Sequence, residues 1–351
     1  MERKVILSAR DVVVKFRVRD RILTAIRKVS LDLYEGETLA IVGESGSGKT
    51  VLTKTFTGML ESNGFISEGK IFFEDQDLVL TKNNKAWEKI RGSKIATVFQ
   101  DPMSSLNPIR TIGSQITEVI IKHQKKNSKE AKEMAIDLMN KVGIPNAADR
   151  FTEYPFQYSG GMRQRIVIAI ALACHPKILI CDEPTTALDV TIQAQILELI
   201  KHLQKEFGFT TIYITHDLGV VANVAQRVAV MYAGQIVEYG TAHEIFYSPK
   251  HPYTWALLSS LPQLGIKGER LYSIPGTPPS LFYEVKGDAF AQRNPYAMNI
   301  DYEEEPPFFM ITESHFAKTW LLDPRAPKTE PPTAIRDLHG TIEKIYGKEG
   351  A

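Results

Sequence analysis

The segment from Gly43 to Thr50 constrains the fold of this chain more than any other part of its sequence. It reads Gly-Glu-Ser-Gly-Ser-Gly-Lys-Thr, and it lies between the apolar run 38–42 and a helix-compatible run that starts at Val51. A glycine-rich turn between a buried strand and a helix lets consecutive backbone N–H groups point at one phosphate group. The segment therefore predicts a strand, a phosphate-binding loop and a helix. The predicted nucleotide-binding residues here are Gly43, Glu44, Ser45, Gly46, Ser47, Gly48, Lys49 and Thr50.

Four side chains are candidates for the chemistry at this loop. Lys49 is expected to bridge the β- and γ-phosphate oxygens of ATP, and the Thr50 hydroxyl is expected to bind Mg²⁺. The apolar run 177–181 ends in Asp182 and Glu183. The first acid is placed to hold Mg²⁺ through water, and the second is the natural general base for an attacking water. Taken alone, the two acids could belong to a solvated turn, but together with the loop they favour nucleotide hydrolysis.

Short apolar runs predict the central sheet. The runs 38–42, 177–181 and 210–215 are almost wholly apolar, which is typical of strands buried on both faces of a sheet. Helical stretches separate them, so the pattern predicts an α/β fold around a largely parallel sheet. One of these helices is expected to have Ser128 as its N-cap and to run to Val142.

Two hairpins are predicted outside this core. Apolar and polar residues alternate from Val12 to Arg17, and the charged turn 19–21 follows them, a pattern that indicates antiparallel strands. The second hairpin is expected between the runs 227–232 and 235–239, which Ala233 and Gly234 join.

Length and charge limit the class of protein. The chain has 351 residues and a formal net charge of +1, so it can form more than one compact unit and has no excess positive charge that would favour nucleic acid as a partner. No apolar run approaches the roughly 20 residues that span a bilayer. The first residues also lack the apolar segment of a secretory signal, so we expect a cytosolic protein. Cys174 and Cys181 lie in apolar runs and are expected to be buried, reduced thiols.

The composition changes after about residue 250. Prolines at 252, 262, 275, 278 and 279 break any long helix, and four more lie between 324 and 332. We therefore divide the chain into a main domain, 1–250, an irregular C-terminal domain, 251–323, and a tail, 324–351.

A second candidate anion site lies between the loop and the acids. Ser159, Gly160 and Gly161 precede a strongly apolar helix that includes Ile166, and the N-terminal end of a helix attracts anions. A plain helix cap would give the same pattern. The surrounding segment, Tyr-Ser-Gly-Gly-Met-Arg-Gln-Arg, nevertheless resembles the LSGGQ signature of ABC ATPases, with Tyr158 and Met162 in place of the usual Leu and Gln.

Further motifs of the ABC ATPases occur in the family's order. They are Phe16 for the aromatic residue that stacks on adenine, Gln100 for the Q-loop, Ala187-Leu188-Asp189 for the D-loop and His216 for the switch histidine. The resemblance implies a P-loop NTPase fold of the ABC nucleotide-binding type. Such a domain has an antiparallel β subdomain and an α-helical subdomain, here at about 101–175, to which the small irregular C-terminal domain is added.

The same resemblance implies a head-to-tail dimer of ATPases. The phosphate loop of one subunit would face Ser159, Gly160 and Gly161 of the other, with ATP and Mg²⁺ between them. Gln100 would sense the Mg²⁺ and the attacking water, and His216 would hold the γ-phosphate. Asp189 would link the two sites across the interface.

Three longer stretches, 99–108, 251–258 and 274–281, resemble the ATPases of oligopeptide and dipeptide permeases, most closely the D-type subunit. The resemblance implies an importer on the cytoplasmic face of the cell membrane. Its other parts would be an F-type ATPase, two membrane subunits that dock near the segment after Gln100, and an external peptide-binding protein. Import of nickel or a glycan is an alternative. A DNA-repair or chromosome ATPase is a weaker one, because no coiled-coil heptads interrupt this chain.

One departure from these relatives concerns a metal cluster. Many of them carry four cysteines that hold an iron–sulfur cluster in the C-terminal domain. Here those positions are Asp288, Asn294, Asp301 and Thr319. Oxygen ligands replace thiolate poorly at iron–sulfur centres, so we expect no cluster and a domain held by its aromatic residues, namely Phe290, Tyr296, Phe308, Phe309 and Trp320.

Overall fold

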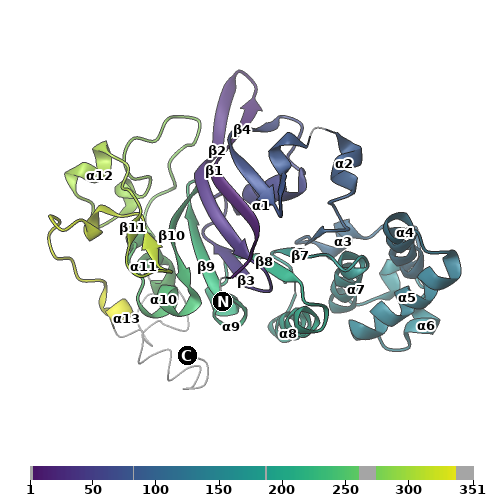
Figure 1. The fold of residues 1–351 in the computed structure, drawn as a ribbon. Coiled ribbons are helices and arrows are strands. Elements are labelled where there is room, and N and C mark those ends of the chain that lie inside the picture. The colour runs from purple at the N-terminus through teal and green to yellow at the C-terminus, as the bar shows by residue number, and fades with distance from the viewer. Residues whose placement is uncertain (1–2, 82, 186–187, 261–273, 337–351) are drawn as a thin grey trace.

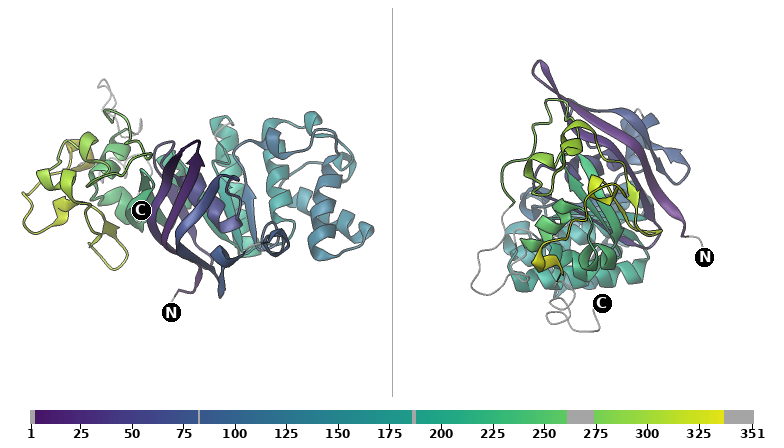
Figure 2. Two further views of the ribbon diagram at one scale, coloured as in Figure 1. Left: turned by 90° about the horizontal axis from the view of Figure 1, so that it is seen from above. Right: turned by 90° about the vertical axis from the view of Figure 1, so that its left-hand side faces the viewer.

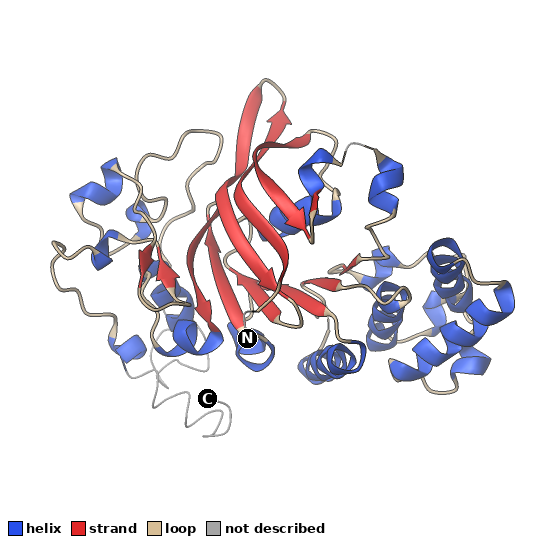
Figure 3. Ribbon diagram, viewed as in Figure 1, coloured by secondary structure: helices blue, strands red, loops and turns tan. Residues whose placement is uncertain are grey.

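The computed structural model describes residues 3–81, 83–185, 188–260 and 274–336. Within them lie two β-sheets, with helices packed around the larger one (Figure 1, Figure 3). The strands are β1 (Val5–Val18), β2 (Arg21–Tyr34), β3 (Thr38–Val42), β4 (Gly64–Phe73), β5 (Gln76–Asp77), β6 (Ile95–Val98), β7 (Ile178–Asp182), β8 (Thr210–Thr215), β9 (Arg227–Tyr232), β10 (Gln235–Thr241), β11 (Phe309–Met310) and β12 (Phe316–Ala317). The helices are α1 (Lys49–Thr57), α2 (Asn84–Glu88), α3 (Pro102–Ser105), α4 (Ile112–Gln124), α5 (Ser128–Lys141), α6 (Ala147–Arg150), α7 (Gly160–Leu172), α8 (Val190–Phe207), α9 (Leu218–Val224), α10 (Ala242–Tyr247), α11 (Pro252–Ser259), α12 (Asn299–Glu303) and α13 (Thr333–Arg336).

The larger sheet has the order β11-β12-β10-β9-β3-β8-β7-β6. Strands β9, β3, β8, β7 and β6 run parallel to one another, which confirms the predicted α/β class. β3 lies in the middle, so the phosphate loop that follows it starts from the centre of the sheet. The smaller sheet, β2-β1-β4-β5, is antiparallel, and its first hairpin turns at Arg19 and Asp20 as expected.

The two faces of the larger sheet lie in two different hydrophobic cores, because side chains alternate between the faces along each apolar strand. Leu39 and Ile41 of β3 pack in the core shared with the antiparallel sheet, whereas Ala40 and Val42 pack in the core shared with the helices. Successive side chains of a strand point to opposite faces, so a strand that is apolar throughout is stable only where both faces are covered. The larger sheet is therefore covered on one face by the antiparallel sheet and α1, and on the other by helices that include α4, α5, α7 and α8.

The helices α3 to α7 form a group at one end of the molecule (Figure 1, Figure 2). Helix α5 begins one residue earlier than a cap at Ser128 requires, so the expected N-cap is wrong. Asn127 is the cap: its side chain accepts hydrogen bonds from the N–H groups of Lys129 and Glu130, and the Glu130 carboxylate accepts one from the Asn127 N–H. These three bonds satisfy the N–H groups of Asn127, Lys129 and Glu130 at the start of the helix, which identifies Asn127 as the cap.

The C-terminal residues continue the larger sheet rather than forming a separate layer. β12 pairs antiparallel with β10, and β11 pairs with β12, so the sheet crosses the predicted boundary at residue 250. Phe290 is fully buried against Tyr232 and Tyr253. Of the other aromatic residues expected to hold this region, Phe308 keeps 44% of its surface exposed.

The structure also shows how far the two cysteines are buried and whether a helix could span a membrane. Cys181 is fully buried in β7 and Cys174 is half-buried, and burial raises the pKa of both thiols. Among the described residues, no helix combines the length and the apolar character that crossing a membrane requires.

Candidate functional site

The phosphate loop connects β3 to α1 through three glycines with left-handed backbone. Gly43, Gly46 and Gly48 have φ angles of 151°, 81° and 103°, values that L-residues with a side chain rarely adopt. A Cβ on Gly43 would meet the carbonyl oxygen of Met231 in the neighbouring strand β9. A side chain at position 43 would clash with β9, so the loop can take this conformation only with glycine there.

Lys49 begins helix α1 and is held inside this loop. Its Nζ donates hydrogen bonds to the carbonyl oxygens of Gly43 and Glu44, at 2.8 and 2.9 Å. Burial lowers the pKa of Lys49, whereas the nearby carboxylates of Glu183 and Asp182 raise it. A buried amine with carbonyl partners only can exchange them for phosphate oxygens, which bear a full negative charge.

Thr50 and Asp182 bring two oxygen ligands together beside the loop. The Thr50 Oγ1 donates a hydrogen bond to the Asp182 Oδ1 at 3.1 Å. Burial raises the pKa of Asp182, and the bond from Thr50 lowers it. No group of three or more His, Cys, Asp or Glu side chains suited to a metal ion occurs in the described part of the chain. A hydroxyl and one carboxylate fit Mg²⁺, which takes one or two protein ligands and completes its shell with phosphate and water.

Glu183 follows Asp182 and takes a left-handed backbone conformation, with φ at 48°. Its N–H donates to the carbonyl oxygen of Ile214 in β8 at 2.9 Å, which holds this strained backbone in place. Its carboxylate accepts a hydrogen bond from Gln100 Nε2 at 3.1 Å and lies 3.2 Å from His216 Nδ1. Three neighbouring strands, β6, β7 and β8, thus each contribute one polar side chain at their carboxyl ends.

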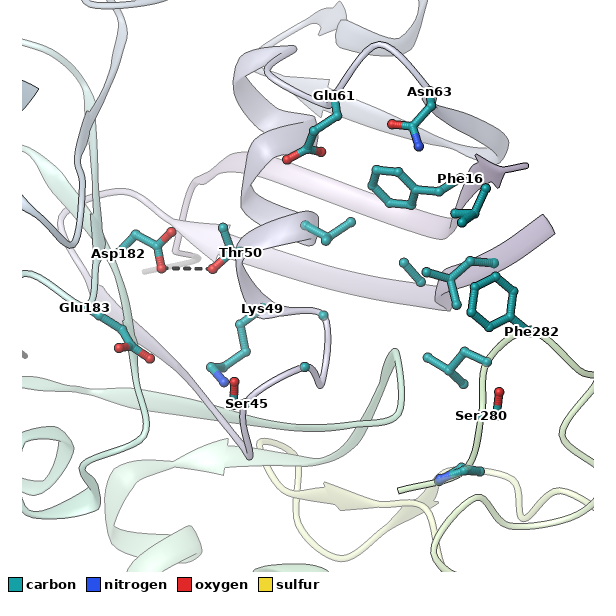
Figure 4. Close-up of a pocket in the computed structure, with 18 of the residues that line it drawn as sticks. Phe16, Ser45, Lys49, Thr50, Glu61, Asn63, Asp182, Glu183, Ser280 and Phe282 are labelled. Carbon is teal, nitrogen blue, oxygen red and sulfur yellow. Dashed lines mark hydrogen bonds between the residues drawn. The ribbon is translucent and has the colours of Figure 1, made fainter. Parts of the chain in front are cut away.

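A cavity of about 810 Å³ joins these groups to the antiparallel sheet (Figure 4). Phe16 lines it from β1, at the end away from Asp182 and Glu183. The lining residues are Phe16, Val18, Leu23, Ala25, Ser45, Gly46, Gly48, Lys49, Thr50, Val51, Glu61, Asn63, Gln100, Asp182, Glu183, Pro279, Ser280, Leu281 and Phe282. The cavity therefore has one charged end and one largely apolar end, as a bound nucleotide requires.

The residues of the signature segment lie elsewhere and do not line this cavity. Ser159 caps α7 by accepting a hydrogen bond from the Met162 N–H at 3.4 Å. A Cβ on Gly161 would lie 2.7 Å from the Ile192 side chain, and one on Gly160 would lie 3.7 Å from Leu188. Gly161 therefore allows α7 to pack closely against the start of α8, whereas a Cβ on Gly160 would make an ordinary van der Waals contact.

The D-loop segment lies next to the signature rather than next to the phosphate loop. Asp189 is the N-cap of α8 and accepts a hydrogen bond from the Ile192 N–H at 3.0 Å. Ala187, the first residue of the predicted D-loop, is outside the described residues. A single chain therefore holds two separated groups of predicted site residues.

The structure adds residues that sequence reasoning missed. Arg293 makes a bidentate ion pair with Glu44 of the phosphate loop, with nitrogen–oxygen distances of 2.7 and 2.9 Å. The Tyr253 hydroxyl accepts a hydrogen bond from the Glu44 N–H at 2.8 Å. Leu281 and Phe282 line the cavity. Tyr253 and Leu281 fall within stretches that resemble peptide permeases. However, no local sequence pattern indicates that such residues contact parts of the chain that lie some 200 residues earlier.

Comparisons with known proteins agree with this geometry. Residues 26–186 match the ABC transporter family, and residues 237–300 match the family described as the oligopeptide/dipeptide transporter C-terminal region. The oligopeptide transport ATP-binding protein AmiE of Streptococcus pneumoniae is 69% identical, over 99% of this chain and 98% of that protein. The oligopeptide transport ATP-binding protein OppD of Bacillus subtilis is 55% identical, over 97% of this chain and 96% of that protein.

Solved structures show the same fold. The dimeric ATP-binding cassette MJ0796 bound to ADP and Pi superposes with a TM-score of 0.60 and 27% identity, covering 67% of this chain and 98% of that one. The protein cbiO1 of Clostridium perfringens, part of the ABC transporter complex cbiONQ, gives a TM-score of 0.61 at 29% identity, covering 70% of this chain and 92% of that one.

Proposed function

The chain belongs to the ATP-binding subunits of ABC transporters, in their oligopeptide and dipeptide branch, and on this premise we propose that it hydrolyses Mg-ATP to drive the import of oligopeptides. The observation that carries the proposal is the convergence of the phosphate loop with the carboxyl ends of β6, β7 and β8. Thr50 contacts Asp182, and Glu183 lies between Gln100 and His216. These are the parts that phosphoryl transfer to water requires.

We propose the following roles for the side chains. Lys49 exchanges its carbonyl partners for the β- and γ-phosphate oxygens, while Thr50 and Asp182 hold Mg²⁺, Asp182 through water. Phe16 contacts the base. The metal ion would neutralise the charge that develops on the phosphate oxygens during transfer.

Glu183 is the proposed general base for the attacking water. Its carboxylate already lies within hydrogen-bonding reach of Gln100 and His216, so it takes one defined orientation at the edge of the cavity. Gln100 is proposed to orient the water and to contact Mg²⁺, and His216 is proposed to hold the γ-phosphate. A positioned base of this kind contributes about 10²–10⁴-fold to the rate.

A second ATPase subunit completes each site in this proposal. Ser159, Gly160, Gly161 and Asp189 lie outside the cavity of their own chain, so they are proposed to meet the nucleotide of a partner chain arranged head to tail. The F-type ATPase of the same transporter is the proposed partner. ATP would then hold the two subunits together, and hydrolysis would let them separate.

Two membrane subunits are proposed to dock on the face that follows Gln100, and an external protein would deliver the peptide to them. In that segment Met103 and Ile109 keep 61% and 82% of their surfaces exposed. Large apolar side chains left in contact with solvent favour a protein interface. Docking there would hold this chain at the cytoplasmic face of the membrane.

The proposed enzymatic function is tested by hydrolysis in the complex that contains this chain. ATP turnover is expected in wild-type complex and is expected to be lost with Lys49→Ala in this subunit. The Lys129→Ala change removes an exposed lysine of α5 that does not line the cavity, and serves as the control. Unchanged turnover with Lys49→Ala, at full assembly of the complex, contradicts the proposal.

We also propose that the C-terminal region binds no iron–sulfur cluster. Asp288, Asn294, Asp301 and Thr319 are all buried, and each accepts a hydrogen bond from a backbone N–H close by in the sequence. Their oxygens thus act as caps of local turns. The purified protein, reconstituted with iron and sulfide without oxygen, is expected to keep less than about a tenth of an iron per chain, a level far below the stoichiometric ligation that a cluster requires; stoichiometric iron and sulfide contradict the proposal.

A further inference from the structure

The apolar end of the nucleotide cavity has two walls that come from opposite ends of the chain. Phe16, Val18 and Leu23 line it from the hairpin of β1 and β2, and residues 279–282 line it from the C-terminal region. In Figure 4, Phe16 and Phe282 lie at the same end of the cavity, with the phosphate loop between them and Asp182. Both walls lie outside residues 26–186, which match the ABC transporter family, and the second wall lies within residues 237–300, which match the C-terminal region of oligopeptide/dipeptide transporters.

The second wall is fixed to the first by specific contacts. The N–H of Thr24 in β2 donates a hydrogen bond to the carbonyl oxygen of Leu281 at 3.0 Å. The Arg21 guanidinium lies over the rings of Phe282 and Tyr283, with its carbon 4.6 and 4.8 Å from the ring centres. A backbone bond and a cation–π contact together hold Phe282 at the mouth of the cavity.

The chemistry of this end suits a purine base. Most of its wall residues are apolar, with Glu61 and Asn63 beside Phe16 as polar exceptions, and the basic group that faces the cavity, Lys49, lies at the other end. Flat aromatic rings gain from apolar and aromatic surfaces on both sides. Phe16 has only one side available, because a Cβ on Gly64 would lie 2.6 Å from its ring, so β4 covers its other side.

We propose that Leu281 and Phe282 form a second contact surface for the base of ATP, so that the C-terminal region is part of the nucleotide site. The proposal rests on the proposed function, since it concerns the same nucleotide. It makes the affinity for ATP depend on how the C-terminal region sits on β2. A change in that region could then alter nucleotide binding without touching the phosphate loop.

Binding of ATP and of inorganic tripolyphosphate, measured by calorimetry on the full-length chain, tests this proposal. Phe282→Ala and Leu281→Ala are each expected to weaken ATP binding by roughly three- to tenfold, the size of one aromatic or apolar contact. Binding of tripolyphosphate, which has no base, is expected to stay the same. Lys49→Ala is expected to weaken both ligands, because it acts at the phosphates.

Tyr283→Ala is the matched control. Tyr283 contacts the same Arg21 but does not line the cavity, so its loss is expected to leave the affinity for ATP within a factor of two. Equal ATP affinity in wild type, Phe282→Ala and Leu281→Ala overturns the proposal, and so does an equal loss for ATP and tripolyphosphate. A wild-type chain that binds neither ligand overturns the proposed function as well, which separates the two failures.

A second measurement needs no variant. Photolabelling of the wild-type chain with 2-azido-ATP is expected to modify two peptides, one that contains Phe16 and one that contains Phe282. Excess ATP is expected to prevent both modifications. Label confined to the peptide with Phe16 overturns the proposal.

Discussion

Glu183 is the residue on which the proposed chemistry depends most. Its carboxylate is oriented by Gln100 and His216, and the amide of glutamine would keep its size but not its basicity. We expect Glu183→Gln to bind ATP with wild-type affinity and to lower hydrolysis at least about 100-fold, as loss of a general base does. Single-turnover hydrolysis in the assembled complex checks this. Turnover within threefold of wild type would reject Glu183 as the base.

Asp288 makes the stability of the fold depend on pH. Its pKa is raised from 3.8 to about 7, chiefly by burial and also by the neighbouring Asp301, and the bond from the Phe290 N–H opposes this rise. The folded chain therefore binds this proton more tightly than the unfolded chain. The stabilisation that results is complete below about pH 4 and is lost as the pH rises toward about 7.

Asp288→Asn mimics the protonated acid, so it is expected to restore the stability that the wild type has lost at pH 8. The melting temperature at pH 8 is expected to rise by roughly 2–4 °C for each kcal/mol of unfolding free energy that is regained. At pH 5 the difference is expected to be smaller than at pH 8, because less of the stabilisation has been lost there. Asp20→Asn, in the exposed turn between β1 and β2, is the control and should change neither value. The prediction is contradicted if the Asp288→Asn variant differs from the wild type in melting temperature by the same amount at both pH values.

At the scale of elements, contacts from the C-terminal region hold the phosphate loop in place. Arg293 pairs with Glu44 through two hydrogen bonds and donates a third to the Tyr232 hydroxyl at 3.2 Å. Hydrogen bonds to charged groups contribute about 1.5–3 kcal/mol each when buried, and the partial exposure of Glu44 reduces this. The ion pair between Arg293 and Glu44 fixes the position of Glu44, the second residue of the loop. It therefore also fixes the Glu44 carbonyl oxygen, which accepts a hydrogen bond from Lys49.

We therefore expect Arg293→Ala to raise the KM for ATP by roughly three- to tenfold, the cost of about one lost charge-assisted contact, with a much smaller change in kcat. Arg293→Lys keeps the charge but not the two-pronged geometry, so it should recover part of the affinity. Steady-state kinetics of the complex give the two constants separately. A fall in kcat at unchanged KM would show that the pair acts in some other way.

Local patterns and long-range contacts differ in how far the sequence reveals them. β3, the phosphate loop and α1 could be predicted because the patterns that indicate them lie within about twenty consecutive residues. These patterns are an apolar run, a glycine-rich motif and a helix-compatible run. The N-cap of α5 was missed because Asn127 and Ser128 are both good caps, and only the reciprocal bond to Glu130 distinguishes them. The contact of Arg293 with Glu44 was not predictable, because tertiary packing alone brings the two residues together.

At the scale of the whole molecule, the two groups of predicted site residues do not meet within this chain. The cavity residues converge around Glu183, whereas Ser159 and Asp189 cap helices on a surface outside the cavity. Each group could be predicted from the sequence because it has its own motif, and the roles of its residues stay predictions. In the proposed function a partner chain brings the two groups together, and no pattern within one sequence places that chain.

The central claim is that ATP hydrolysed at this site drives the import of peptide. It is tested most directly by uptake of a radiolabelled oligopeptide into vesicles that contain the whole transporter and enclose Mg-ATP. We predict uptake that requires the enclosed ATP and falls to background with Lys49→Ala in this chain. ATP hydrolysis should rise with the peptide and not with nickel or a glycan. Peptide uptake that continues with Lys49→Ala, or hydrolysis stimulated only by another cargo, would contradict the claim.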